Sequence, residues 1–167
     1  MRNNLVIGLL GHRSSGKSTT WNRLFEENVR TGINIRSLYL TQTEYIQVFL
    51  VSGSPEERET YVGEIIGEQR PRIVLCSMQY ISDVSETIDF FVNNDYFLYI
   101  QWLNPGYSDQ NTTAHADYLG IMNRILSLDS TFSIRNGKYD PASRMQEIVN
   151  FLYGWANSRN LLLVDPS

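Results

Sequence analysis

The apolar residues of this chain form two kinds of pattern, and together these patterns predict its fold. Short runs of apolar and β-prone residues have the length of strands, and runs without polar alternation indicate strands buried on both faces. Six runs have strand length: 4–10, 37–40, 45–51, 72–77, 96–103 and 131–135. After Asn4, the first of them has no polar residue, which is typical of a parallel sheet covered by helices.

Between these runs, apolar residues recur at intervals of three and four positions, which is the spacing of an amphipathic helix. Five helices are expected on this basis, over 16–29, 54–66, 83–93, 113–127 and 140–156. The second has a capping box, with Ser54 as the cap, Pro55 at the first helical position and Glu57 closing the box. The last helix is expected to begin with Asp140 as its cap.

The connection between the second and third runs decides the direction of one strand. Only residues 41–44 separate these runs, whereas a parallel crossover needs about a dozen residues. A hairpin is therefore expected, with one strand antiparallel to the rest. Residues 161–164 are either an edge strand or a packed tail. The sequence predicts an α/β fold, a three-layer α/β/α sandwich with a mostly parallel central sheet of about six strands, in a single domain spanning 1–167.

Composition narrows the range of partners. The net charge of −4 argues against an electrostatic nucleic-acid surface, and no basic run is present. The sequence contains no signal peptide and no apolar stretch of about 18 residues that could span a bilayer. The single cysteine, Cys76, lies inside an apolar run and is interpreted as a small buried side chain. A cytoplasmic protein without nucleic-acid or membrane partners is expected.

The residues that follow the first strand run form a motif suited to binding phosphate. Gly11-His12-Arg13-Ser14-Ser15-Gly16-Lys17-Ser18 has the form G-x-x-x-x-G-K-[ST], between an apolar run and a helical pattern. Glycine permits backbone angles that a Cβ forbids, so successive N–H groups can converge on phosphate oxygens. A lysine adds a mobile positive charge for the β and γ phosphates, and a serine hydroxyl can bind Mg²⁺.

This segment resembles the Walker A motif of P-loop NTPases. The resemblance implies the P-loop NTPase fold, with Lys17 as the catalytic residue and Ser18 as a Mg²⁺ ligand. It also implies that ATP or GTP is bound by the loop residues Gly11, His12, Arg13, Ser14, Ser15, Gly16, Lys17, Ser18 and Thr19. His12 and Arg13 have two interpretations, contact with a phosphate or partner group and a solvated loop position.

Two branches of the superfamily are similar to the rest of the chain. The hairpin and the segment 51–57 are similar to Ras-like small GTPases, although Leu50 stands where that family has aspartate, and 104–107 lacks the lysine and aspartate that read guanine. The segment 132–137 before the last helix resembles nucleotide monophosphate kinases, although Ser77 replaces their acid near the strand end. ATP is therefore preferred over GTP as the expected ligand.

A Mg²⁺-binding carboxylate is missing from its usual place. No aspartate or glutamate ends an apolar strand beside the glycine loop, where a Walker B acid would hold the metal. The nearest candidates are Glu56, Glu57, Asp83 and Asp109. Of these, Asp83 is predicted to be the metal ligand beside Ser18, with a helix-start acid as the alternative. His115 has no partner at metal-ligand spacing and is predicted to be a surface residue.

These observations predict a protein that binds a purine NTP with Mg²⁺ and hydrolyses it or transfers its γ-phosphoryl group. One alternative is a non-catalytic switch, in which nucleotide reshapes the segments 31–40 and 52–67 to recruit a protein partner. A nucleoside or nucleotide monophosphate kinase is the other alternative. The ligand is expected outside the carboxyl ends of the strands, which the sequence puts at Leu10, Val51, Ser77, Leu103 and Arg135.

Overall fold

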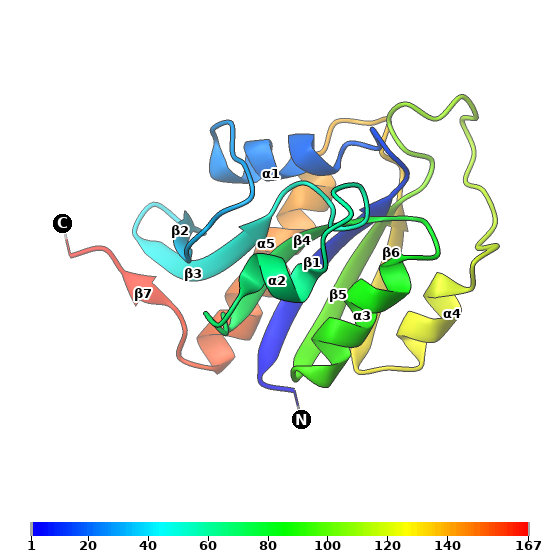
Figure 1. Ribbon diagram of the computed structural model, residues 1–167. Coiled ribbons are helices and arrows are strands. Elements are labelled where there is room, and N and C mark those ends of the chain that lie inside the picture. The colour runs from blue at the N-terminus through cyan, green and yellow to red at the C-terminus, as the bar shows by residue number, and fades with distance from the viewer. Residues whose placement is uncertain (1, 167) are drawn as a thin grey trace.

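The computed structural model describes residues 2–166, and within them the chain forms a seven-stranded sheet with five helices (Figure 1). The strands are β1 Asn4–Gly11, β2 Arg36–Tyr39, β3 Glu44–Val51, β4 Ile73–Gln79, β5 Tyr96–Leu103, β6 Ser130–Arg135 and β7 Leu163–Val164. The helices are α1 Lys17–Phe25, α2 Val62–Ile66, α3 Val84–Asn93, α4 Ile121–Leu126 and α5 Ala142–Ser158.

The sheet is mostly parallel, with β1 near its centre. Its strand order is β2-β3-β4-β1-β5-β6, and β7 pairs with β3 outside this path. β1 is parallel to β4 and β5, while β2 and β7 both run antiparallel to β3. The hairpin prediction is confirmed. The expected count of about six strands with one antiparallel is corrected to seven with two, because 163–164 pairs with the start of β3.

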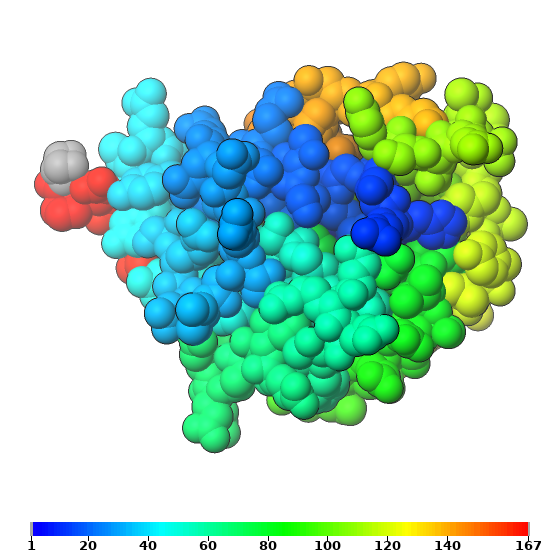
Figure 2. Space-filling model, turned by 45° about the horizontal axis from the view of Figure 1, so that its top comes forward, coloured from blue at the N-terminus to red at the C-terminus, as the bar shows by residue number. Residues whose placement is uncertain are grey.

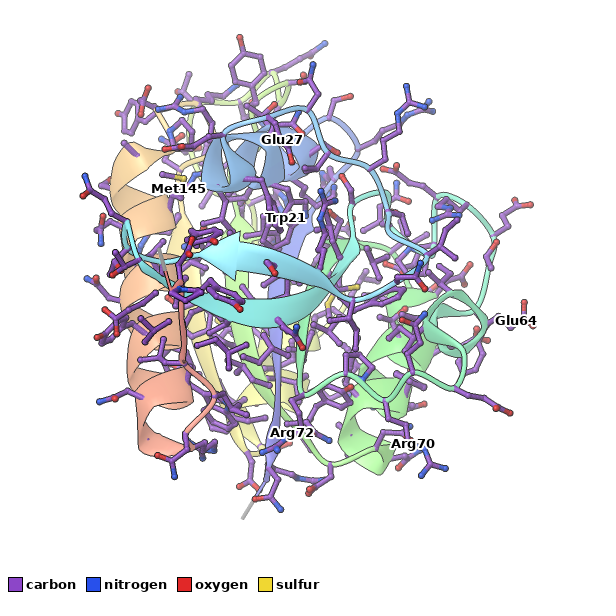
Figure 3. The ribbon with its side chains drawn as sticks, turned by 90° about the vertical axis from the view of Figure 1, so that its left-hand side faces the viewer. Trp21, Glu27, Glu64, Arg70, Arg72 and Met145 are labelled. Atoms are coloured by element: carbon purple, nitrogen blue, oxygen red, sulfur yellow. The ribbon has the colours of Figure 1, made fainter. Side chains whose placement is uncertain are left out.

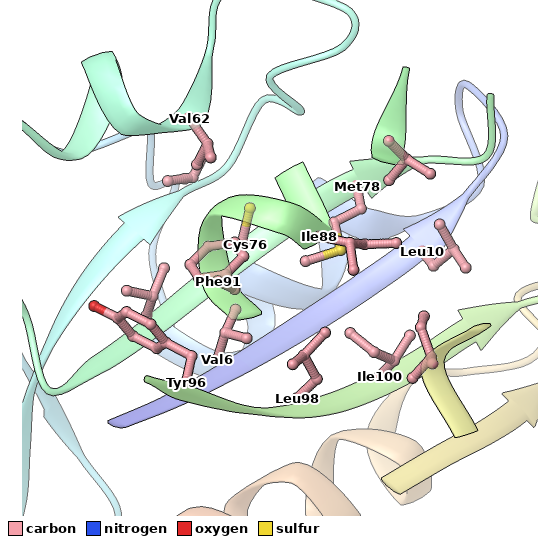
Figure 4. Close-up of a cluster of buried hydrophobic side chains, with 14 of the residues drawn as sticks. Val6, Leu10, Val62, Cys76, Met78, Ile88, Phe91, Tyr96, Leu98 and Ile100 are labelled. Carbon is pink, nitrogen blue, oxygen red and sulfur yellow. The ribbon is translucent and has the colours of Figure 1, made fainter. Parts of the chain in front are cut away.

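Helices cover both faces of the sheet. α1 and α5 pack on one face, and α2, α3 and α4 pack on the other, where Figure 1 shows α2 and α3 in front of the strands. Figure 4 shows the face that α2, α3 and α4 cover, where Ile88 and Phe91 of α3 lie over apolar side chains of β1, β4 and β5. Cys76 is buried in this cluster, as predicted. The α/β layering is therefore confirmed, and none of the described helices is long and apolar enough to cross a membrane.

Trp21 connects α1 to the strand beside β1. It is fully buried between the helix and the sheet, and its position under α1 can be followed in Figure 3. Its indole Nε1 donates a hydrogen bond of 2.9 Å to Ser77 Oγ on β4. The glycine loop connects α1 to β1, and the hydrogen bond to Ser77 connects α1 to β4. The helix is therefore held against both strands.

Three predicted helices are shorter than expected. α1 ends at Phe25 because Glu26 adopts a left-handed conformation, and α4 covers only the second half of 113–127. The predicted helix over 54–66 contains only α2 at its end. Ser54 Oγ accepts a hydrogen bond from the Glu57 N–H (3.3 Å), but Glu59 has a φ of 50°, which ends the turn before a helix can propagate.

Candidate functional site

The glycine loop connects the end of β1 to the start of α1, as the motif predicts. Gly16 has a φ of 104°, a backbone conformation that side chains with a Cβ rarely adopt, and Ser14 has a φ of 59°. Gly16 also occupies the N-cap position of α1, so no side chain caps the first N–H groups of the helix. These donors and the positive end of the helix dipole are suited to an anion.

Two other loops hold the glycine loop in place at the carboxyl ends of the strands. The N–H groups of Tyr107 and Ser108 donate to the carbonyl oxygens of Ser15 (3.0 Å) and Ser14 (3.2 Å). A Cβ at Gly106 would lie 2.6 Å from the Ser15 Cβ, and one at Gly137 would lie 2.8 Å from the Ser15 carbonyl oxygen. The loops after β5 and β6 therefore reach Ser15 at distances that only glycine allows.

The Lys17 side chain lies against the loop and is buried, with only 6% of its surface exposed. Its Nζ donates to the carbonyl oxygens of Gly11 (3.1 Å) and His12 (2.8 Å), and to Ser15 Oγ (3.3 Å). Burial lowers the pKa of the ammonium group, while the charges of Glu57 and Glu56 raise it. The fold thus keeps one cation close to the loop and holds it by oxygen atoms that a phosphate could replace.

A cavity of about 380 Å³ opens beside this lysine. Residues from three parts of the chain line it: Arg13–Thr19, Ser52–Ser54 with Glu57, and Tyr107 with Ser108. Figure 2 shows this end of the molecule, where the blue surface of the N-terminal third lies between the teal segment that follows β3 and the yellow-green and orange loops after β5 and β6. Of the predicted loop residues, Gly11 and His12 contribute carbonyl oxygens to Lys17 but do not line the cavity.

Glu57, from the irregular segment 54–60 that the sequence predicts to be helical, supplies an acid to the cavity that Ser18 lines. Among the described residues, Glu57 is the acidic residue that lines the cavity together with Ser18. Asp83, the predicted metal ligand, instead lines a separate hollow with Glu56 and Thr87. The turn at residues 80–83 carries the chain past the end of β4 before α3 begins, so the structure does not bring Asp83 to Ser18.

Glu56 lies at the place where the sequence shows no acid, the carboxyl end of the strand beside β1. Its carboxylate accepts hydrogen bonds from the Gln79 N–H and from Thr87 Oγ1, each 2.7 Å long. Only 8% of its surface is exposed. Burial raises the pKa of the carboxyl group, and the two hydrogen bonds and the charge of Lys17 oppose that increase. A residue of the segment after β3 thus supplies a carboxylate to the end of β4.

Replacing Glu56 with glutamine should stabilise the protein at neutral pH relative to the wild type, and the gain should disappear in acid. A folded-state pKa above the unfolded value means that the folded protein binds the proton more tightly. The wild type therefore loses stability as pH rises from the unfolded pKa through the folded one, whereas the neutral amide does not. Urea unfolding between pH 4 and pH 8 measures this difference, with the exposed change Glu64→Gln as the control.

A gain that is constant across this pH range would contradict the assignment of a burial cost to the Glu56 carboxylate. A gain at pH 4 that is lost by pH 8 would contradict the sign of the shift. The amide can still accept from the Gln79 N–H and can donate to Thr87 Oγ1, so both contacts can be kept, the second with its direction reversed.

Arg144 is a residue that the sequence interpretation missed. It lies on the buried face of α5, four positions before Ile148, and its Nη1 donates to Thr20 Oγ1 on α1 (2.5 Å). Within the described residues its Nε has no hydrogen-bond partner, and burial lowers the pKa of the guanidinium to about 10. A basic residue at the start of an otherwise apolar stripe was the available signal. The structure therefore has a second buried cation behind the loop.

His115, which the sequence predicts to be a surface residue, is half-buried, and the fold brings it to ring partners that are distant in sequence. His115 stacks on His12, with ring centroids 4.6 Å apart and an angle of 6° between the planes. Asp109 lies at the same place, so three residues separated by up to about a hundred positions in sequence meet there. The pKa of His12 is lowered by burial and by the charge of His115, against the charge of Asp109.

A scan of the sequence against protein-family models finds no match, and a search of curated protein sequences finds none either. The function must therefore be inferred from the residues and geometry of the site.

Proposed function

We propose that this protein binds a purine NTP with Mg²⁺, with ATP preferred over GTP, and hydrolyses it or transfers its γ-phosphoryl group. The observation that carries the proposal is the buried Lys17 on a glycine loop that opens into a cavity of about 380 Å³. The loop follows a central parallel strand and precedes a helix with no side-chain cap, which is the context in which its sequence motif binds phosphate.

In this proposal the chain contributes charge and positioning. The loop N–H groups and the Lys17 ammonium bind the phosphates, and Lys17 neutralises the charge that develops as the γ-phosphoryl group leaves. Ser18 and Glu57 line one cavity and offer a hydroxyl and a carboxylate, the hard oxygen ligands that suit Mg²⁺. When bound, Mg²⁺ would supply positive charge that offsets the negative charge of the phosphates. Tyr107, which is 67% exposed at the cavity, supplies an aromatic face for a base.

The first test is thermal unfolding of the full chain with Mg-ATP, Mg-GTP, Mg-ADP and Mg-GDP. A nucleotide at a hundred times its Kd should raise the free energy of unfolding by about 2.7 kcal/mol, and the Tm should rise by about 5 °C or more. Removing Mg²⁺ with EDTA should reduce the shift, and Glu57→Gln should reduce the difference between Mg²⁺ and EDTA. If none of the four nucleotides changes the Tm, the proposed ligand class is wrong.

A nucleotide-dependent switch is the second candidate, and one contact favours it. Thr31 Oγ1 accepts hydrogen bonds from the N–H groups of Ser52 (3.0 Å) and Gly53 (3.3 Å). The segment after α1 is thus connected to a segment that borders the cavity. A ligand that displaces residues 52–54 would disturb this connection. The candidates separate by turnover, because a hydrolase releases phosphate with no acceptor, a monophosphate kinase needs an added monophosphate, and a switch binds without turnover.

A further inference from the structure

The second hollow of interest lies beside the glycine loop, and Lys17 is not among the residues that line it. It has a volume of about 350 Å³ and is lined by His12, Asp109, His115, Tyr118 and three polar loop residues. One ligand atom from each of His12, Asp109 and His115 lies within 4.8 Å of the other two, and all three residues are half-buried. We propose that His12, Asp109 and His115 bind a divalent transition-metal ion, with Zn²⁺ as the representative of its class.

The donor set determines the class of ion. Two imidazoles and one carboxylate suit Zn²⁺ and its first-row neighbours, whereas Mg²⁺ prefers oxygen ligands in an octahedral arrangement. Three protein ligands leave one coordination position for water or a substrate atom. In a tetrahedral zinc site, ligand atoms lie about 3.4 Å apart, so the three side chains must move slightly closer together.

The surroundings of His115 prepare it to bind an ion. Its backbone is fixed by Asn104, whose Nδ2 donates to the His115 carbonyl oxygen (2.8 Å) and whose Oδ1 accepts from the His115 N–H (2.9 Å). Its Nδ1 lies 3.2 Å from the Ala116 carbonyl oxygen. With the proton on Nδ1, this contact orients the ring and leaves the lone pair of Nε2 for a metal, which is how protein carbonyls orient metal-binding histidines.

Asp109 and the aromatic wall complete the site. One carboxylate oxygen of Asp109, Oδ2, accepts the Gly106 N–H (2.8 Å), and its other oxygen, Oδ1, accepts no hydrogen bond from residues 2–166 and can bind an ion. The rings of Tyr80, Trp102 and Tyr118 lie 5.3–6.1 Å from the His115 ring and form one side of the site. Residues 104–120 form no helix or strand, so Asp109 and His115 can rotate toward His12 without breaking a regular element.

The ion would connect the glycine loop directly to the segment after β5. His12 belongs to the loop, and its carbonyl oxygen accepts from Lys17, whereas Asp109 and His115 belong to that segment. The site is distinct from the cavity that Ser18 lines, and His12 is absent from the lining of that cavity. The metal proposal therefore does not depend on nucleotide binding.

The test titrates the tag-free, EDTA-treated full chain with Zn²⁺ alone and follows the imidazole nitrogens by NMR. The chain has two histidines, so both imidazoles can be assigned by a single substitution. We expect one Zn²⁺ per chain, a simultaneous change of both imidazole signals, and no such change with millimolar Mg²⁺. Asp109→Asn should weaken Zn²⁺ binding at least tenfold, and Asp83→Asn, which removes an acid from a different hollow, should not.

Three results would overturn the proposal: no change of either imidazole signal in excess Zn²⁺, a change of one imidazole alone, or an affinity that Asp109→Asn leaves unchanged. An equal response to Mg²⁺ would contradict the class of ion. If Asp109→Asn does not fold, His115→Gln provides the same comparison, because Asn104 binds only the backbone of that residue. No nucleotide is present in this experiment, so its failure is independent of the proposed nucleotide site.

Discussion

Lys17→Ala should remove most of the stabilisation of this protein by nucleotide while leaving the fold intact. If the substitution weakens binding a hundredfold, a nucleotide at a hundred times the wild-type Kd would stabilise the variant by only about 0.4 kcal/mol, compared with about 2.7 kcal/mol for the wild type. The reason is that Lys17 is the buried cation whose Nζ lies among the loop oxygens, where phosphate charge would need compensation. Thermal unfolding of both proteins with and without Mg-ATP measures the effect.

The comparison must be made within each variant, because Lys17→Ala also changes the unliganded protein. It removes a desolvated charge and the donor for three oxygen atoms, and these changes act in opposite directions. Arg23→Ala is the matched control, since Arg23 lies on the same helix but its half-exposed side chain pairs with Asp140 (3.5 Å) outside the cavity. Equal nucleotide shifts in Lys17→Ala and the wild type would disprove the role of the lysine.

Trp21→Ala should cause the largest loss of stability, about 3–5 kcal/mol, which is a large part of the free energy that keeps a domain folded. Trp21 is fully buried between α1 and the sheet, in a cluster built largely from strand residues, which are held by the sheet and cannot collapse into the vacated volume. Urea unfolding should show a lower midpoint with an unchanged m value. A loss below about 1 kcal/mol would contradict the view that this side chain fixes α1 to the sheet.

Trp21→Phe separates packing from the hydrogen bond to Ser77. A suitable comparison is Trp102→Phe, because Trp102 is 1% exposed and its indole Nε1 has no hydrogen-bond partner among the described residues. Both changes remove a similar volume, but Trp21→Phe also leaves the buried Ser77 hydroxyl without its donor, so it should cost about 1–3 kcal/mol more. Equal losses would show that the Ser77 contact contributes little.

Most elements of the fold were predictable because they depend on local pattern. The strand Tyr96–Leu103 and the hairpin follow from apolar runs and from a connection too short for a crossover. The prediction of a helix over 54–60 was wrong. The capping hydrogen bond at Ser54 forms, but it stabilises only one turn, because Glu59 adopts a left-handed conformation. The position of β4 between β3 and β1 depends on packing between distant segments, which local patterns do not encode.

The candidate site also has a part that the sequence predicts and a part that it does not. The loop from Gly11 to Thr19 is visible in sequence because its residues are consecutive. The acids of the site are not visible in the sequence. Glu56 and Glu57 belong to an irregular turn after β3, a strand that is not adjacent to β1, so only the fold brings them to the site. His12 and His115 are also invisible as a pair, because no spacing rule connects positions that meet only through β5 and its following loop.

The contacts of Ser15 with Gly106 and Gly137 have a consequence for the order in which the protein folds. The glycine loop consists of a few consecutive residues near the start of the chain, but its final shape requires contacts with the segments that follow β5 and β6. Loop closure over such sequence separations is slow and unfavourable until the intervening strands have paired. The loop should therefore acquire its native geometry late, after the parallel half of the sheet has assembled.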